Sequence, residues 1–163
     1  MPKHSGGMSY TRHKYVRSVP QPKIRRFNLG DSHDDYSHVV LLRAISSGII
    51  SSGALESARV TANKFLEKSG GGFFLKVLVY PHEVVREHKS MGFAGADRIS
   101  RGMSKAFGKP VSRAAKVAVG QPILAVNTKE NAINVAKAAL KRASKKLPIT
   151  YAIDVDEIVN DGE

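Results

Sequence analysis

Two stretches of the chain place apolar residues at the spacing of an amphipathic helix. Residues 52–68 predict one helix, with Ser52 as its N-cap and the glycines at 70–72 as its stop. Residues 128–147 predict a second helix, capped by Thr128 and ended by Pro148. The apolar stripes consist of Leu55, Ala58, Ala62, Phe65 and Leu66 in the first helix, and of Ile133, Ala136, Leu140, Ala143 and Leu147 in the second.

Shorter runs of β-branched and aromatic residues lie between and around these helices. They predict strands, of which residues 73–80 form the clearest, ended by Pro81. Because helices and strands do not alternate strictly, we expect a single α+β domain with two main helices packed on a mixed or antiparallel sheet. The other strand candidates are residues 23–29, 39–45, 116–119, 123–127 and 149–155.

Two long segments lack any such periodicity. Residues 1–22 read as an irregular N-terminal arm, and residues 84–112 as a glycine-rich loop inside the domain that spans residues 23–155. A structureless segment of this length in a compact domain is usually functional or mobile. Residues 156–163 form a short acidic tail.

The charge of the chain is the strongest indication of its binding partner. Lys and Arg number 26 against 14 acidic residues, which gives a net charge of +12. Residues 1–30 carry seven bases and no acid, residues 81–116 eight bases and three acids, and residues 117–148 six bases and one acid. Such an excess favours a polyanionic partner, above all a nucleic acid, although an anionic membrane or no partner at all gives the same composition.

The absence of cysteine and of long apolar runs excludes further kinds of site and of protein. Cysteine is absent, which excludes disulfides and thiolate metal sites, and no apolar run approaches the roughly 18 residues of a membrane span. In the arm, Tyr10 and Tyr15 alternate with bases, a pattern that suits either stacking on exposed RNA bases or a disordered basic tail.

No catalytic constellation is evident. His82 and His88 are six residues apart, whereas two zinc ligands on one helix face need a spacing of four. Five residues separate Gly102 from Gly108 where a phosphate-binding loop has four, and Pro110 replaces its hydroxyl residue. We therefore expect no enzyme, no metal and no cofactor.

Several sequence motifs together resemble one family. They are PKIRRFNLG at 22–30, ALESARVTANK at 54–64, AGADR at 94–98, AFGKP at 106–110 and VGQP at 119–122. They resemble the large-subunit ribosomal protein called L-ten-e in archaea and eukaryotes, homologous to bacterial L-sixteen. The absence of cysteine and the acidic C-terminus favour an archaeal member.

The resemblance implies an α/β-hammerhead fold bound to large-subunit rRNA beside neighbouring ribosomal proteins, in the cytoplasm and without a membrane. It also implies that residues 88–112 form a loop that extends toward tRNA and the peptidyl-transferase centre. The expected tRNA-proximal residues are Gly95, Arg98, Arg101, Gly102, Lys105, Phe107, Gly108 and Lys109, where Phe107 either stacks on a base or packs the base of the loop.

The residue pattern and the resemblance agree on how rRNA would be bound. The arm and the basic helix face would contact phosphates, while glycines would let the loop backbone approach RNA closely. The expected rRNA-binding residues are Arg12, Lys14, Arg17, Lys23, Arg25, Arg26, Lys64, Lys141, Arg142 and Lys145. The rival hypotheses are a freestanding RNA-binding protein or chaperone, and a basic enzyme with a lid loop.

Overall fold

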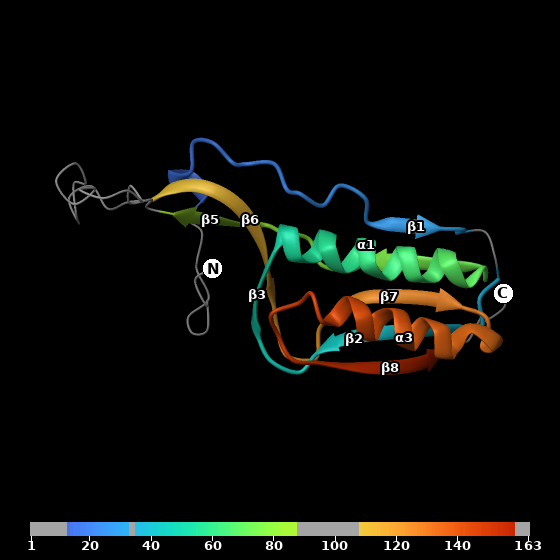
Figure 1. The fold of residues 1–163 in the computed structure, drawn as a ribbon. Coiled ribbons are helices and arrows are strands. Elements are labelled where there is room, and N and C mark those ends of the chain that lie inside the picture. The colour runs from blue at the N-terminus through green and yellow to red at the C-terminus, as the bar shows by residue number, and fades with distance from the viewer. Residues whose placement is uncertain (1–12, 33–34, 88–107, 159–163) are drawn as a thin grey trace, which may run out of the picture.

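The computed structural model describes residues 13–32, 35–87 and 108–158 (Figure 1). Its helices are α1 (Ser52–Ser69) and α3 (Ile133–Ser144), with short 3-10 turns η1 (His13–Tyr15) and η2 (Glu130–Ala132). The strands are β1 (Asn28–Gly30), β2 (His38–Ala44), β3 (Gly48–Ser51), β4 (Phe73–Val77), β5 (Glu83–Glu87), β6 (Lys109–Val117), β7 (Pro122–Thr128) and β8 (Tyr151–Glu157).

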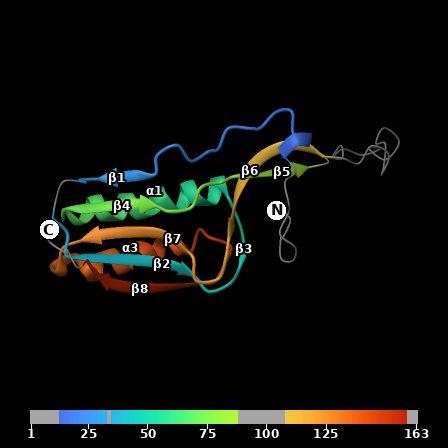
Figure 2. The same cartoon turned by 180° about the vertical axis from the view of Figure 1, so that it is seen from behind.

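Two antiparallel sheets organise these strands. The larger sheet has the order β1-β4-β7-β2-β8, and the smaller has the order β3-β6-β5. Helices α1 and α3 lie side by side on one face of the larger sheet, and the view from behind shows the opposite face without a helix (Figure 2). The expectation of a single α+β domain with two helices on a sheet is therefore confirmed, and within the described residues every strand pair is antiparallel.

The core lies between this sheet and the helices. On β2, the fully buried Val40 and Leu42 alternate with partly exposed residues, whereas on β7 the four consecutive residues from Ile123 to Val126 are all buried. The helices bury mainly small side chains toward one another and the sheet, which allows close approach of their backbones. These residues are Leu55, Ala58, Ala62 and Leu66 of α1, and Ala136, Ala139, Leu140 and Ala143 of α3.

The smaller sheet extends beyond the helix layer. Strands β5 and β6 form a long hairpin that projects past the N-terminal end of α1 in both views (Figures 1 and 2). Only the inner part of β6 pairs with β3, from Ala114 to Val117, so the outer part is paired on one side alone. The hairpin thus carries polypeptide away from the core.

The ends of both helices differ from the predicted ones. The side chain of Ser51, and not of Ser52, accepts a hydrogen bond from the Ala54 N–H at 3.2 Å, while Ser52 is buried. Thr128 is the last residue of β7, paired with both His38 and Phe73, so it cannot cap α3. The η2 turn intervenes, and Ala132 precedes α3 without a side-chain cap.

The strands also depart from their predicted limits. Of residues 23–29, only Asn28 and Leu29 join the sheet as part of β1. Strands β3 and β5 were not predicted, and β6 begins at Lys109 instead of residue 116. Segment 84–112 is consequently strand at both ends, and its part from 88 to 107 lies outside the described residues. Strand β8 runs to Glu157, two residues into the predicted tail.

Gly30 shows why β1 ends where it does. Its φ is +93°, and a Cβ at this position would lie 2.1 Å from the Phe73 carbonyl oxygen. That oxygen accepts a hydrogen bond from the Asp31 N–H at 3.1 Å, so the chain turns directly over β4. Only glycine fits this close approach of two backbones.

Candidate nucleic-acid interface

The basic segment before β1 is fastened to the domain by two residues. Ile24 is fully buried in the core, and the Phe27 carbonyl accepts a hydrogen bond from the Val77 N–H at 2.8 Å. Between and beside these anchors, the side chains of Lys23, Arg25 and Arg26 are exposed. Three cations are therefore held on the surface of the body, and not on a free tail.

The start of the described chain lies near the hairpin. Turn η1 is beside β5 and β6 in both views (Figures 1 and 2). Lys14 places its Nζ atom 5.2 Å from the centre of the Tyr15 ring, and Tyr15 is 57% exposed. Arg17 is exposed as well, whereas Arg12 lies outside the described residues. An exposed phenol beside a cation is a combination that suits RNA.

Helix α3 presents a regular row of cations. Lys137, Lys141 and Lys145 recur at intervals of four residues and are exposed, opposite the buried alanines. Lys141 and Arg142 lie in the last turn, where the helix dipole favours positive charge. The Arg142 guanidinium also lies over the Phe65 ring of α1 at 4.0 Å, so this residue both carries charge and joins the two helices.

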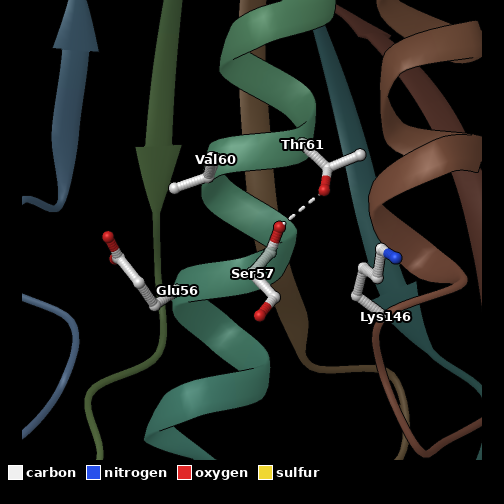
Figure 3. Close-up of a pocket in the computed structure, with 5 residues that line it drawn as sticks. All are labelled: Glu56, Ser57, Val60, Thr61 and Lys146. Carbon is white, nitrogen blue, oxygen red and sulfur yellow. Dashed lines mark hydrogen bonds between the residues drawn. The ribbon is translucent and has the colours of Figure 1, made fainter.

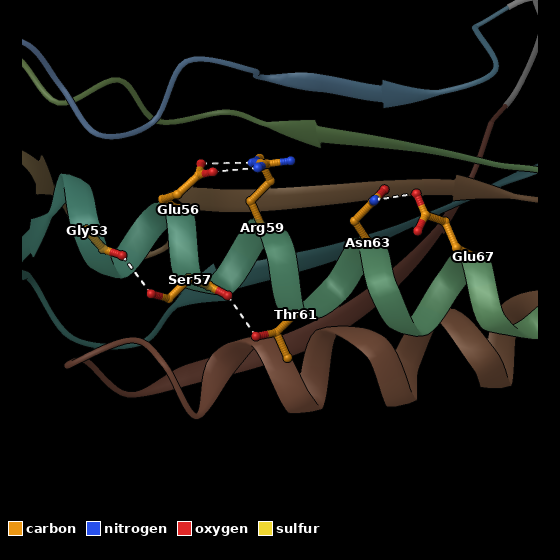
Figure 4. A network of polar contacts seen from close by, with 7 residues as sticks. All are labelled: Gly53, Glu56, Ser57, Arg59, Thr61, Asn63 and Glu67. Atoms are coloured by element: carbon orange, nitrogen blue, oxygen red, sulfur yellow. Dashed lines mark hydrogen bonds and ion pairs between the residues drawn. The ribbon is translucent and has the colours of Figure 1, made fainter.

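On α1, polar residues mostly pair with one another (Figure 4). Arg59 donates two hydrogen bonds to the Glu56 carboxylate, at 2.9 and 2.5 Å, and Asn63 donates one to Glu67 at 2.6 Å. The hydrogen bonds from Arg59 lower the pKa of Glu56 below its ordinary value, and the same pair raises the pKa of Arg59. Lys64, on the same helix, is exposed.

A shallow groove between α1 and the end of α3 is lined by Glu56, Ser57, Val60, Thr61 and Lys146 (Figure 3). Its hydroxyl groups form hydrogen bonds to the backbone of α1: Ser57 donates to the Gly53 carbonyl at 2.9 Å, and Thr61 donates to the Ser57 carbonyl at 2.7 Å. The two hydroxyl donors are therefore used within α1, and Lys146 contributes the remaining charged donor of the groove.

The edge strand β8 has the opposite charge. Asp154 and Asp156 approach the Arg43 guanidinium of β2 at 3.0 and 3.3 Å, and Glu157 lies 3.9 Å from His38. This acidic edge lies across the sheet from β1, beside which Arg25 and Arg26 are held. The acidic edge and the cations before β1 thus lie on opposite edges of the larger sheet, whereas helix α3 with its lysine row packs beside β8.

Most of the predicted loop residues fall outside the described chain: Gly95, Arg98, Arg101, Gly102, Lys105 and Phe107. Gly108 and Lys109 are described, at the outer end of the hairpin. A Cβ on Gly108 would come within 2.9 Å of the Glu87 backbone carbon, so glycine is needed for the two strands to meet here. Lys109 is exposed and pairs in register with Glu87.

The structure also reveals a cluster that the sequence analysis missed. The rings of Phe27 and Tyr80 stack with centroids 5.4 Å apart, and His82 lies 4.6 Å from Tyr80 on the centroid distance. The Arg113 Nη1 atom donates to the Tyr80 hydroxyl at 3.3 Å. The spacing of His82 and His88 gave no sign of this cluster, since Phe27 and Arg113 reach Tyr80 from segments far apart in sequence.

Two further kinds of site can be assessed over the described residues. No group of three or more histidine and acidic side chains gathers there in a way that could hold a metal ion. Neither α1 nor α3 is long and apolar enough to cross a membrane. The exposed cations of the segment before β1 and of α3 lie on a two-layer fold of helices and sheet, which defines the class as a basic α+β protein.

Comparison with known proteins identifies the family within this class. The family model of ribosomal protein L16p/L10e matches residues 6–154. The large ribosomal subunit protein uL16 of Staphylothermus marinus is 48% identical over 152 residues, which covers 92% of this chain and 87% of the relative. The corresponding proteins of Hyperthermus butylicus and Metallosphaera sedula are 46% and 45% identical, and the alignments cover 91% and 94% of this chain and 84% and 90% of the relatives.

The chain belongs to the ribosomal protein L16p/L10e family. The resemblance drawn from the sequence motifs is thereby confirmed, as is its archaeal character. The family is one of structural ribosomal proteins, which also confirms that the chain is not an enzyme.

Proposed function

We propose that this protein is a constituent of the large ribosomal subunit and binds rRNA through the segment 14–26 and the exposed face of α3. The observation that carries the proposal is the anchoring of Lys23, Arg25 and Arg26 by buried Ile24, because charges fixed on a folded body lose little freedom on binding phosphates. The names of the relatives, all large-subunit proteins, support the same assembly.

The acidic β8 edge does not oppose binding through the segment 14–26. Strands β1 and β8 are the opposite edges of the larger sheet, so Asp154, Asp156 and Glu157 lie away from the cations of this segment. If the protein is a component of the ribosome, neighbouring ribosomal proteins are further partners and its location is cytoplasmic. The helix-covered sheet with its projecting β5–β6 hairpin is compatible with the hammerhead-like fold that the resemblance implied.

Sedimentation tests the proposal. Native protein should travel with large subunits through a gradient at high salt, since an assembled component has many simultaneous contacts. A freestanding RNA chaperone would remain at the top of the gradient under the same conditions. Recovery of the protein only in the light fractions would therefore contradict a ribosomal place and favour the chaperone.

We further propose that the loop 88–112 supports tRNA near the peptidyl-transferase centre. The support is geometric: β5 and β6, which flank residues 88–107 in the sequence, project together past the N-terminal end of α1 (Figure 1). Its bases, Arg98, Arg101 and Lys105, suit a second anionic partner.

Replacing residues 95–107 with a short glycine linker separates the two roles. Incorporation into large subunits should fall only partly, because the body and the segment 14–26 remain. Peptide-bond formation and tRNA binding, measured at matched occupancy, should fall much more. Normal tRNA handling by fully occupied mutant subunits would leave the loop as an rRNA anchor.

A further inference from the structure

Three aromatic rings form a ladder from the core to the surface. Phe27 is half-buried and packs against the core, and Tyr80 stacks on it with an interplanar angle of 27°. His82 is the third ring, with its centroid 4.6 Å from that of Tyr80 and its plane tilted by 51°. Tyr80 is 40% exposed and His82 is also exposed, so the outer end of the ladder is open.

The backbone fixes these rings in place. After β4, Val77, Val79 and Pro81 are buried while Leu78, Tyr80 and His82 are exposed in alternation, and the chain turns at Pro81, where the His82 N–H donates to the Tyr80 carbonyl at 3.1 Å. Leu78 donates its N–H to the Ile123 carbonyl at 2.9 Å, and Val77 donates to Phe27 at 2.8 Å. Rings held in this way lose little conformational freedom when a further ring stacks on them.

Arg113 adds a cation at the edge of the ladder. It lies on β6 opposite Val84, and one guanidinium nitrogen contacts the Tyr80 hydroxyl at 3.3 Å. Its Nε atom is buried and has no hydrogen-bond partner among the described residues. A guanidinium has five N–H donors, so Arg113 retains donors for a phosphate or a base beside the rings.

The charge around the ladder selects the ligand. Arg25 and Arg26 directly precede Phe27 and are exposed, so the rings lie beside a cationic surface. Flat faces next to cations match an unpaired nucleotide, whose base stacks while its phosphate meets the guanidinium. A sugar would also use the rings, but it would gain nothing from the cations.

We propose that Phe27, Tyr80 and His82 form a stacking platform for an unpaired base of large-subunit rRNA, with Arg113 contacting the same nucleotide. The proposal rests on the proposed function and adds a particular subsite to it. Stacking on an aromatic side chain contributes to affinity without displacing counterions, unlike the contacts of the basic rows.

The test is binding of purified protein to deproteinised archaeal large-subunit rRNA over a salt series. Replacing the outer ring in His82→Ala, or the central ring in Tyr80→Leu, should weaken binding roughly 5- to 100-fold with an unchanged salt slope. Arg113→Gln should weaken binding and reduce the log–log slope by about 0.7–0.9. Tyr80→Phe keeps the ring and should bind nearly as well as the native protein.

His38→Ala is the matched control, because His38 lies at the acidic β8 edge. Chemical probing should show one unpaired rRNA base protected by the native protein and by His38→Ala, but exposed with His82→Ala. Urea unfolding, followed by tyrosine emission, checks that each variant is folded.

Failure of the platform is distinct from failure of the proposed function. If native protein binds rRNA with a steep salt dependence but His82→Ala and Tyr80→Leu bind equally well, the platform is wrong and rRNA binding stands. If native protein shows no salt-dependent rRNA binding, the proposed function itself is wrong. The stacking platform, which rests on that function, is then wrong as well.

Discussion

The segment before β1 and helix α3 both present exposed cations, but the molecule holds them in different ways. Helix α3 buries four apolar side chains and joins α1 through Arg142 and Phe65, so its lysine row follows from a regular element. Among its described residues, the segment has Ile24 in the core, Phe27 packed against the core, and one backbone hydrogen bond at Phe27. Charge on an irregular segment therefore depends on very few anchors, and a single substitution can displace several cations together.

The largest effect should come from Ile24→Ala. Loss of a fully buried isoleucine costs about 2–5 kcal/mol of stability, and here it also releases the neighbouring bases. Leu140→Ala on α3 is the matched variant, with a similar stability loss and no effect on the segment. Urea unfolding should give comparable losses, while trypsin should cut at Lys23, Arg25 or Arg26 much faster in Ile24→Ala alone. Equal cleavage of the two variants would show that Ile24 is not the anchor.

A smaller effect should follow from Gly30→Ala, which disturbs the strand that ends the segment. The new Cβ would meet the Phe73 carbonyl oxygen and impose strain at a φ of +93°, with an expected cost of about 1–3 kcal/mol. Gly70→Ala has a similar φ of +71° with open space around it, so it should cost less, about 1 kcal/mol. Denaturant midpoints compare the two, and a smaller loss for Gly30→Ala would rule out the backbone clash.

The smallest effect concerns the Glu56–Arg59 pair, which lies on α1 between the two basic regions. Glu56→Gln should destabilise the protein by about 0.3–0.5 kcal/mol at neutral pH, as for other helix-surface pairs. The pKa of Glu56 is lowered in the folded state, so the stabilisation is complete above the carboxyl's ordinary pKa and is lost as pH falls through the lowered one. The difference between the two proteins in urea should therefore vanish in acid. A difference that persists unchanged in acid would show that the charge pair is not its source.

The same comparison explains what the sequence could predict. The periodicity of apolar residues predicted α1 and α3, because the buried face of a helix repeats every three or four residues, as in Leu55, Ala58 and Ala62. It could not place Ile24, whose burial depends on strands and helices distant in sequence. The predicted strand over residues 23–29 was mostly wrong for the same reason, since only β4 could decide which of these residues pair.

The smaller sheet could not be predicted either, because its strands pair with residues that are distant in the sequence. Strand β3 has four residues, and the outer half of β6 contains Pro110 and exposed Val111, so neither has a clear two-residue alternation. Strand β3 forms because it pairs with the inner part of β6, and the outer part of β6 forms because it pairs with β5. The ring ladder was missed likewise, because Phe27, Tyr80 and Arg113 come from three segments. Of the candidate site, the bases of α3 and of the segment were identifiable, but not the anchors that fix the segment.

The most direct test of rRNA binding by these two regions is the salt dependence of affinity in charge-neutralised variants. One variant replaces Lys23, Arg25 and Arg26 with Gln, a second replaces Lys137, Lys141 and Lys145, and Lys76→Gln on the helix-free face is the control. If the cations contact phosphates, the log–log slope should fall by about 0.7–0.9 for each lost contact, a total of roughly two for each triple variant, and should not change for Lys76→Gln. An unchanged slope in both triple variants would contradict the account.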